Sequence, residues 1–387
     1  MIPLKYNLRN LRVRWVTTLM TVLATGLVVW ATVLTFGLTD GLDHALRVTG
    51  DPLDLMVLRK GANDETSSTI TPDMARQIAA LPGIAADGQG TALSSAEFVT
   101  ILTKPRRDGG GTTNLIVRGL TDVGRALRPA FQIVEGRDLT PGVNEAITSR
   151  QMAGRFENLR IGESLDINQV QFRIVGYFEA GGSAAESEVW ADLRDLTGAR
   201  RQQGAISIVQ LRAVDAAAKK SLTDTLRDDE QFKLNPLDEV EFYENQSSAS
   251  IAIKVVGYII GLFLTFGAMF AAANTMYAAV ASRGREIGTL RALGFRRHSI
   301  LTSFMLESVV ICLLGGLLGC LATLPFNGLS TGTANWATFS EITFAFRFGP
   351  AVFLRGLVMA LTMGLLGGLF PAIHAVRLKI VDALRSR

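Results

Sequence analysis

The 387-residue sequence predicts an α-helical membrane protein with four transmembrane helices and an α+β extracytoplasmic domain inserted between helices 1 and 2. Four apolar runs, at 16–38, 251–280, 300–324 and 350–373, are each long enough to cross a bilayer. A mean hydropathy of +0.27 is high for a soluble protein and low for a fully embedded one. A few spans beside one large polar domain therefore explain the composition.

Residues 1–15 carry four basic residues and no acid. The larger apolar side chains recur there at helical spacing, namely Leu4, Leu8, Leu11 and Trp15. This pattern predicts an amphipathic helix on the inner membrane surface. A signal peptide is the alternative, but the run 16–38 is long for one and no convincing small-residue cleavage site is present. We therefore expect residues 16–38 to form the first transmembrane helix.

The distribution of charge predicts the orientation in the membrane. The segment 39–250 holds 23 basic and 31 acidic residues. The short segments 1–15, 281–300 and 374–387 together hold 13 basic and 2 acidic residues. Short basic flanks stay in the cytoplasm, whereas large domains cross regardless of charge. We expect a multi-pass protein of the inner membrane, with both termini cytoplasmic and the segment 39–250 outside.

The segment 39–250 alternates short strand and helix patterns. Thr71 and Pro72 have the residue types of an N-cap and a first helical position. Lys104–Thr113 contains three consecutive glycines but lacks the G-x-x-x-x-G-K-[ST] pattern, so we expect a flexible hairpin loop rather than a phosphate site. We expect a β-α-β unit at Ile206–Arg212, Asp215–Asp229 and Phe232–Leu234. Asp238–Ser250 should prolong the second span as a helical stalk, and 325–349 should be a short external loop.

The stretch Ser282–His298, within the predicted cytoplasmic loop 281–299, has five arginines and one acid. Ile287, Leu290 and Gly294 recur at helical spacing, which predicts a short helix with a narrow apolar face. Gly294 follows Leu293 as a helix C′ glycine does. From spacing alone, a stiff helix that contacts a partner and a solvated loop that only fixes topology are both open.

The stretch ANTMYAAVASRGREIGTLRALGFRRHSILTSFMLES resembles the signature of MacB/FtsX-type permeases of ABC transporters. The matching positions are Asn274, Arg283 to Gly294, and Glu307 with Ser308. The C-terminal FPAIHAVRLKIVDALRSR resembles the closing motif of the same family, with Ile380 where a proline is usual. Parts of the segment 39–250 also resemble the extracytoplasmic domain of MacB-type permeases, which implies that the α+β domain has two lobes.

The resemblance implies a dimer, formed with itself or with a paralogous permease, that is driven by a separate ABC ATPase subunit. In this family ATP-driven movement of the spans is passed to the extracytoplasmic domains, a mechanism called mechanotransmission. A periplasmic adaptor protein and membrane lipids are the other expected partners, and no nucleic acid is expected. The residues expected to bind the ATPase are Arg283, Arg285, Glu286, Ile287, Leu290, Arg291 and Gly294.

The spans carry small residues at four-residue spacing, which allows close helix packing. The rows include Gly257 and Gly261, Gly315 and Gly319, and Gly364 and Gly368. Packing within the chain and packing against a second chain are both open for each row. Glu307 lies inside the third span, where a charge is costly. It either couples the cytoplasmic side to the bundle or pairs with a loop arginine such as Arg297. Asn274, in the second span, is the other membrane-embedded position of the family motif.

The sequence contains no Walker A motif, no G-x-S-x-G or H-E-x-x-H motif, and no metal-type Cys/His spacing. We therefore expect no catalysis and no bound cofactor or metal in this chain, with ATP and Mg²⁺ acting on the partner ATPase. Export or efflux with a periplasmic adaptor is the first functional hypothesis. An FtsX-type regulator of a cell-wall hydrolase or sensor, a lipoprotein-releasing permease and a membrane-anchored binding protein are the alternatives. The size of the segment 39–250 favours export.

Overall fold

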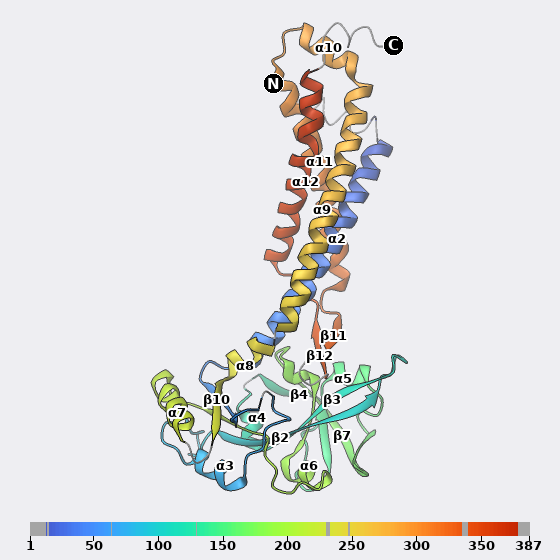
Figure 1. Cartoon of the computed structure of the whole chain (residues 1–387). Helices are drawn as coiled ribbons and strands as arrows, with labels where there is room; N and C mark the ends of the chain where they lie inside the picture. The colour runs from blue at the N-terminus through green and yellow to red at the C-terminus, as the bar shows by residue number, and fades with distance from the viewer. Residues whose placement is uncertain are drawn as a thin grey trace. The chain divides into compact units, whose positions relative to one another are not determined.

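The computed structural model describes residues 13, 15–62, 64–128, 130–229, 233–246, 248–334 and 340–377 (Figure 1). The chain divides into two compact units. The helical unit comprises Met1–Asp40, Ile251–Leu329 and Phe346–Arg387, and the α/β unit comprises Gly41–Ser250 and Ser330–Ala345. Most of the predicted amphipathic helix at 1–15, and the tail after residue 377, lie outside the described residues.

Four long helices run alongside one another in the helical unit (Figure 1). They are α2 (Trp15–Thr49), α9 (Ser248–Ser282), α11 (Arg297–Thr323) and α12 (Pro350–Arg377). By length and composition, each is able to cross a membrane. The short helix α10 (Gly284–Ala292) joins α9 to α11, and a 3₁₀ turn, η2 (Leu324–Phe326), follows α11.

Helix α2 is longer than the predicted span 16–38 and ends at Thr49. The apolar run ends near Leu38, but the helix continues through Gly41 and ends at Thr49, just before Gly50 and Pro52. In the predicted stalk 238–250, α8 (Glu239–Gln246) and the start of α9 are helical on either side of residue 247.

Glycines bring the helices of this unit close together. A Cβ added at Gly319 on α11 would lie 2.5 Å from the carbonyl oxygen of Gly26 on α2. A Cβ at Gly364 on α12 would lie 2.8 Å from Val309 Cα on α11. Gly315 and Gly368 leave equally little space, against Thr25 and Ser308. These rows therefore pack within the chain.

In the described part of the α/β unit, ten strands form one continuous sheet in the order β10-β1-β9-β2-β3-β8-β5-β7-β4, with β6 paired to β7. The strands are β1 (Asp54–Arg59), β2 (Ser94–Pro105), β3 (Thr112–Leu120), β4 (Phe131–Gly136), β5 (Glu145–Thr148), β6 (Ser164–Ile167), β7 (Val170–Ala180), β8 (Glu188–Asp192), β9 (Ile208–Arg212) and β10 (Leu234–Asp238). Besides α8, the helices of this unit are α3 (Pro72–Ala79), α4 (Asp122–Ala126), α5 (Arg150–Arg155), α6 (Leu193–Ala199) and α7 (Ala216–Asp228), with one 3₁₀ turn, η1 (Ala184–Ser187).

Several local predictions are confirmed. Thr71 accepts a hydrogen bond from Met74 N at the start of α3, with Pro72 in the first position. The glycine-rich tip joins β2 to β3 as a hairpin. The β-α-β unit is present as β9, α7 and β10. It is split, because β1 lies between the two parallel strands and is antiparallel to both.

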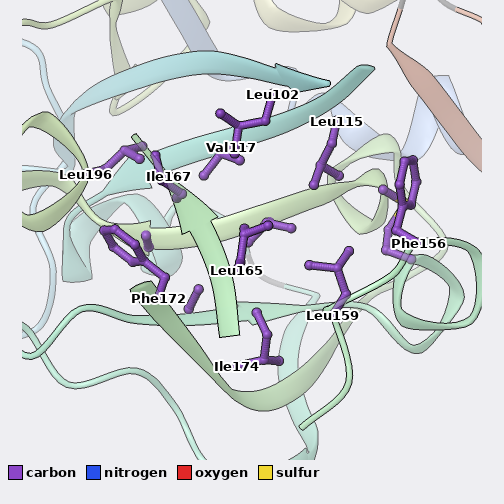
Figure 2. Close-up of a cluster of buried hydrophobic side chains, with 14 of the residues drawn as sticks. Leu102, Leu115, Val117, Phe156, Leu159, Leu165, Ile167, Phe172, Ile174 and Leu196 are labelled. Atoms are coloured by element: carbon purple, nitrogen blue, oxygen red, sulfur yellow. The ribbon is translucent and has the colours of Figure 1, made fainter. Parts of the chain in front are cut away.

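The sheet has separate hydrophobic cores on either side of β2. One core gathers around Leu165, Phe172 and Ile174, whose side chains converge with those of β2 and β3 in Figure 2. Another lies between β1, β9 and the helices α3 and α7, around Ile78 and Leu222. Strand β2 belongs to both regions, because it pairs with β9 through Ser94–Glu97 and with β3 further along.

The segment predicted as a short external loop, 325–349, contains a β-hairpin of β11 (Ser330–Ala334) and β12 (Glu341–Ala345) that belongs to the α/β unit. The buried carboxylate of Glu341 pairs with Arg106 Nη1 at 3.1 Å and with Arg155. Thr343 N donates to Ser187 Oγ at 2.8 Å. The loop is therefore folded and fixed to this unit by buried polar contacts that local sequence did not reveal.

Candidate partner-binding site around helix α10

Helix α10 begins just after an interruption of the helical conformation at Arg283. Helix α9 ends at Ser282, and Arg283 has φ −112° and ψ 16°, outside the helical region. Arg283 N still donates to Val280 O at 3.2 Å, and Ile287 N donates to Arg283 O at 3.0 Å. The chain therefore turns from one helix into the next with its backbone hydrogen bonds satisfied.

The side chain of Arg283 holds this turn to the third long helix. Its Nη1 donates to Glu307 Oε2 at 2.9 Å, and its Nε donates to Glu286 Oε2 at 3.3 Å. The guanidinium also lies 5.1 Å from the centre of the Phe304 ring. Arg283 and Glu307 are both buried. Breaking such a pair is costly, because the charge that remains would be buried without its partner.

Two expectations about these residues need correction. The arginine that pairs with Glu307 is Arg283 rather than Arg297, which is exposed. Arg283 itself does not project toward a partner protein, because its guanidinium is buried against side chains of its own chain. Sequence distance suggested Arg297, which is closer along the chain, but the fold brings the start of α10 back to α11.

Ile287 is also placed differently from the prediction. Its side chain is 2% exposed and belongs to a hydrophobic cluster with Met276, Phe304 and Ala372. Gly288 is buried beside it. The apolar stripe of α10 therefore faces the helical unit, and Ile287 contributes to the core rather than to an exposed docking face.

The end of α10 has the geometry that Gly294 predicted. Gly294 has φ +94°, a conformation that glycine adopts at low cost. Gly294 N donates to Arg291 O and Phe295 N donates to Leu290 O, each at 3.1 Å. These two bonds are those of a Schellman motif, which ends a helix and redirects the chain. The predicted C′ role of Gly294 is confirmed.

Arg291 ties the same helix to the last long helix. Its Nη1 donates to Val376 O at 3.2 Å, near the C-terminus of α12. Arg283 bonds to Glu307 in α11, and Ile287 packs in the core, so α10 is attached to several helices at once. Helix α10 therefore contacts both α11 and α12 directly.

The outer face of α10 and the loop after it is basic and partly apolar. Leu293, at the C-cap, is 73% exposed, and Leu290 is half-buried. The other exposed side chains on this surface are Arg285, Glu286, Thr289, Arg296 and Arg297. We call this set, with Leu290 and Leu293, the α10 surface.

The other family positions have distinct surroundings. Ser308, which follows Glu307, donates from Oγ to Gly364 O at 2.9 Å and thus binds α11 to α12. Asn274 lies instead on an exposed face of α9. The structure therefore does not place Asn274 beside the buried Glu307. In the described ranges, no three His, Cys, Asp or Glu side chains gather as a metal site.

Two family models match this chain. The model described as "FtsX-like permease C-terminal" matches residues 258–380. The model described as "MacB-like periplasmic core domain" matches residues 18–228, more than half of the chain. Together they cover both the helices around α10 and most of the α/β unit.

Curated relatives are similar over part of their length. The macrolide export ATP-binding/permease protein MacB of Chlorobium luteolum is 27% identical over 254 residues, which is 61% of this chain and 36% of that protein. The ABC transporter permease YknZ of Bacillus subtilis is 32% identical over 136 residues, 35% of this chain and 32% of that protein. The matched part of the chain thus spans about a third of each relative.

The solved structures that are similar to this chain are also domains of MacB and YknZ, at low sequence identity. The periplasmic region of MacB from Actinobacillus actinomycetemcomitans is 13% identical and covers 54% of this chain and 98% of its own, with a TM-score of 0.38. The extracellular domain of YknZ from Gram-positive bacteria is 15% identical, covers 48% and 99%, and has a TM-score of 0.36. The family models are therefore the basis of assignment, together with the four apolar helices. The chain belongs to the MacB/FtsX-type ABC transporter permeases, membrane proteins with an extracytoplasmic domain.

Proposed function

We propose that this chain is the membrane subunit of an ABC export system and passes movement from a separate ATPase to its α/β unit. The observation that carries the proposal is the attachment of α10. Arg283 joins it to Glu307 on α11, and Arg291 joins it to Val376 on α12. A partner that moves α10 therefore acts on two long helices at once. ATP and Mg²⁺ would bind the ATPase, since this chain has no Walker A motif.

The proposed topology places α10 and both termini in the cytoplasm and the α/β unit outside. Support comes from the basic residues of the loop 281–299 and the acidic excess of the segment 39–250. The match of residues 18–228 to a periplasmic core domain agrees with this orientation. The inner membrane is the proposed location.

The α10 surface is the proposed contact for the ATPase. A helix that enters a groove on a partner needs an apolar anchor and complementary charges. Leu293 and Leu290 supply the anchor, and Arg285 supplies positive charge for acids on the ATPase. Ile287, Arg283 and Gly294 then act indirectly, by fixing the position of the helix.

A dimer is the proposed assembly, because an ABC system uses two nucleotide-binding subunits and one α10 serves one of them. Helix α9 is the proposed contact, with itself or with a paralogous permease. The central part of α9 is the least buried of the four apolar helices, and Asn274 lies on its exposed face. An amide in an apolar helix surface favours a hydrogen bond to a second helix over exposure to lipid.

Export with a periplasmic adaptor is the proposed biological role. Curated relatives named for macrolide export match 34% to 64% of this chain, and the matching periplasmic core model covers most of the α/β unit. These matches favour export over the regulatory and lipoprotein-releasing roles.

Two charge substitutions on the α10 surface test the proposal. Leu293→Asp and Arg285→Glu should prevent co-purification of the ABC ATPase and stimulation of its hydrolysis in reconstituted membranes. The permease should stay inserted with an unchanged unfolding temperature, because both side chains are exposed. Lys220→Glu, on the exposed face of α7, is the charge-matched control and should behave as wild type. Wild-type binding and stimulation in both α10 variants would show that this loop only fixes topology.

A further inference from the structure

Arg355 lies on the outward face of one of the four apolar helices. It is in the second turn of α12, and its side chain is exposed. Leu354 beside it is 63% exposed, and Val358, about one turn further along, is 50% exposed. Apolar side chains that remain exposed on a membrane-spanning helix contact lipid. The Arg355 guanidinium therefore borders the lipid rather than the interior of the helical unit.

The chain supplies no acidic partner for this guanidinium. Among the described residues, Arg355 forms no ion pair and no side-chain hydrogen bond. Asp40 lies one turn beyond Phe36 on α2, but it is not paired with Arg355 in this part of the chain. An arginine stays charged at every physiological pH, and a charge beside hydrocarbon is costly unless it reaches polar groups. An anionic partner from outside the chain is therefore expected.

An aromatic ring fixes the position of the guanidinium. The Arg355 Cζ lies 6.0 Å from the centre of the Phe36 ring on α2. The same ring lies 5.5 Å from the ring of Tyr258 on α9. Tyr258 is 55% exposed, and its hydroxyl has no hydrogen-bond partner among the described residues. Arg355 and Tyr258 thus contact one ring, and both carry donors that the described chain leaves unused.

These side chains lie at the same end of three membrane-length helices. The apolar run of α2 ends near Leu38, just after Phe36. The membrane-length part of α9 begins at Val255, one turn before Tyr258, and α12 begins at Pro350. Side chains at the end of a span meet the lipid headgroups, where tyrosine and arginine are favoured. The donors are therefore at the depth of the lipid phosphates.

We propose that Arg355 and Tyr258 bind the phosphate of an anionic phospholipid. The guanidinium donates two parallel hydrogen bonds to phosphate oxygens, the geometry that arginine favours with phosphate, and the Tyr258 hydroxyl donates a third. The acyl chains lie along Leu354 and Val358. A choline headgroup brings its own cation beside Arg355, so a lipid with net negative charge binds better. In the proposed topology this site belongs to the outer leaflet, and binding does not involve the ATPase.

The probe is dioctanoyl-phosphatidylglycerol, added to the full chain in a neutral detergent, with bound lipid counted by native mass spectrometry. Dioctanoyl-phosphatidylcholine should bind about fivefold more weakly, because one arginine near an anionic headgroup gains roughly 1 kcal/mol. Arg355→Gln should lower affinity for phosphatidylglycerol about tenfold or more, because a hydrogen bond between charged groups contributes roughly 1.5–3 kcal/mol. Arg355→Lys should be intermediate, since lysine keeps the charge without the planar fork. Phe36→Leu should also weaken binding.

The matched control is Arg194→Gln, at an exposed position of α6 in the α/β unit, which removes the same charge and should bind like wild type. Unfolding temperatures of all variants separate a loss of binding from a loss of folding. Equal binding of the two lipids, or wild-type affinity in a folded Arg355→Gln variant, overturns the proposal. Glycerol 3-phosphate binding as tightly as the lipid would identify a free phosphate compound as the ligand instead. Loss of dimer with unchanged lipid binding in Arg355→Gln would assign this face to a second copy of the chain.

Discussion

Arg283 and Glu307, 24 residues apart in the sequence, meet as a buried ion pair with 2.9 Å between Nη1 and Oε2. The pair connects the start of α10 to the interior of α11. The pair explains why Glu307 is tolerated inside the apolar helix α11, because its negative charge is neutralised by Arg283 from the turn between α9 and α10. The same contact makes the position of α10 depend on the packing of the long helices.

Removal of either charge should destabilise the helical unit. Glu307→Leu leaves Arg283 buried without its main partner, at a cost of about 3–5 kcal/mol. The double variant Arg283→Met with Glu307→Leu should recover much of the loss, because neither charge remains. Thermal unfolding of the detergent-solubilised chain measures this. Arg297→Ala is the control, and a larger effect there than in Glu307→Leu would contradict the assigned pair.

The glycine rows give a second prediction. Gly319→Ala and Gly364→Ala should lower the unfolding temperature, because each added methyl would approach a backbone atom of another helix within 2.5–2.8 Å. Gly267→Ala on α9 is the matched control, since a Cβ there meets no atom within 4 Å. Alanine is the better helix former, so this control should be neutral or slightly stabilising. Similar losses in all three variants would show that glycine is not needed for close packing.

The β11–β12 hairpin should depend on the buried carboxylate of Glu341. Glu341→Ala leaves Arg106 and Arg155 without this partner, so amide hydrogen exchange across the hairpin should become faster. Gly332→Ala should act in the same direction, because its methyl would lie 2.9 Å from Arg155 Nη2. Gly349→Ala, where a Cβ meets nothing within 4 Å, should leave exchange unchanged. Unchanged exchange in Glu341→Ala would mean that the hairpin is held by its other contacts alone.

Glu239, at the start of α8, should make the stability of the chain depend on pH. Burial raises the pKa of Glu239 from an ordinary 4.5 to about 8, with the Asp54 and Glu97 charges acting in the same direction and Arg128 and the Asp51 N–H against it. The folded chain therefore holds this proton to higher pH than the unfolded chain. Its contribution to stability is complete below about pH 4.5 and decreases by up to about 1.4 kcal/mol per pH unit until about pH 8.

The comparison of wild type with Glu239→Gln isolates this effect. Glutamine keeps an oxygen for Asp51 N, which donates to Glu239 at 2.9 Å. The difference in unfolding temperature between the two proteins should move in favour of the variant as the pH rises from 5 to 8. A difference that is constant over this range would show that Glu239 titrates normally.

The sequence alone determined the features that depend on local chemistry. Four apolar runs predicted the long helices, because a helix satisfies its own backbone in an apolar setting. Thr71 with Pro72, and Gly294, predicted a helix start and a helix end, because caps depend on one or two neighbouring residues. The motif from Arg283 to Gly294 was sufficient to indicate the family.

Only the tertiary structure decided the contacts between distant segments. The periodicity of the sequence predicted an apolar stripe on α10 that includes Ile287. It did not predict whether that stripe contacts a partner protein or the core of the same chain. Arg297 was as good a candidate as Arg283 for pairing with Glu307, because both arginines carry the same charge and the sequence does not show which of them the fold brings to Glu307. The loop 325–349 lacked a strong strand pattern, and its hairpin is fixed by Arg106 and Arg155, more than 170 residues away. Such contacts depend on where the chain returns in space, which local sequence does not encode.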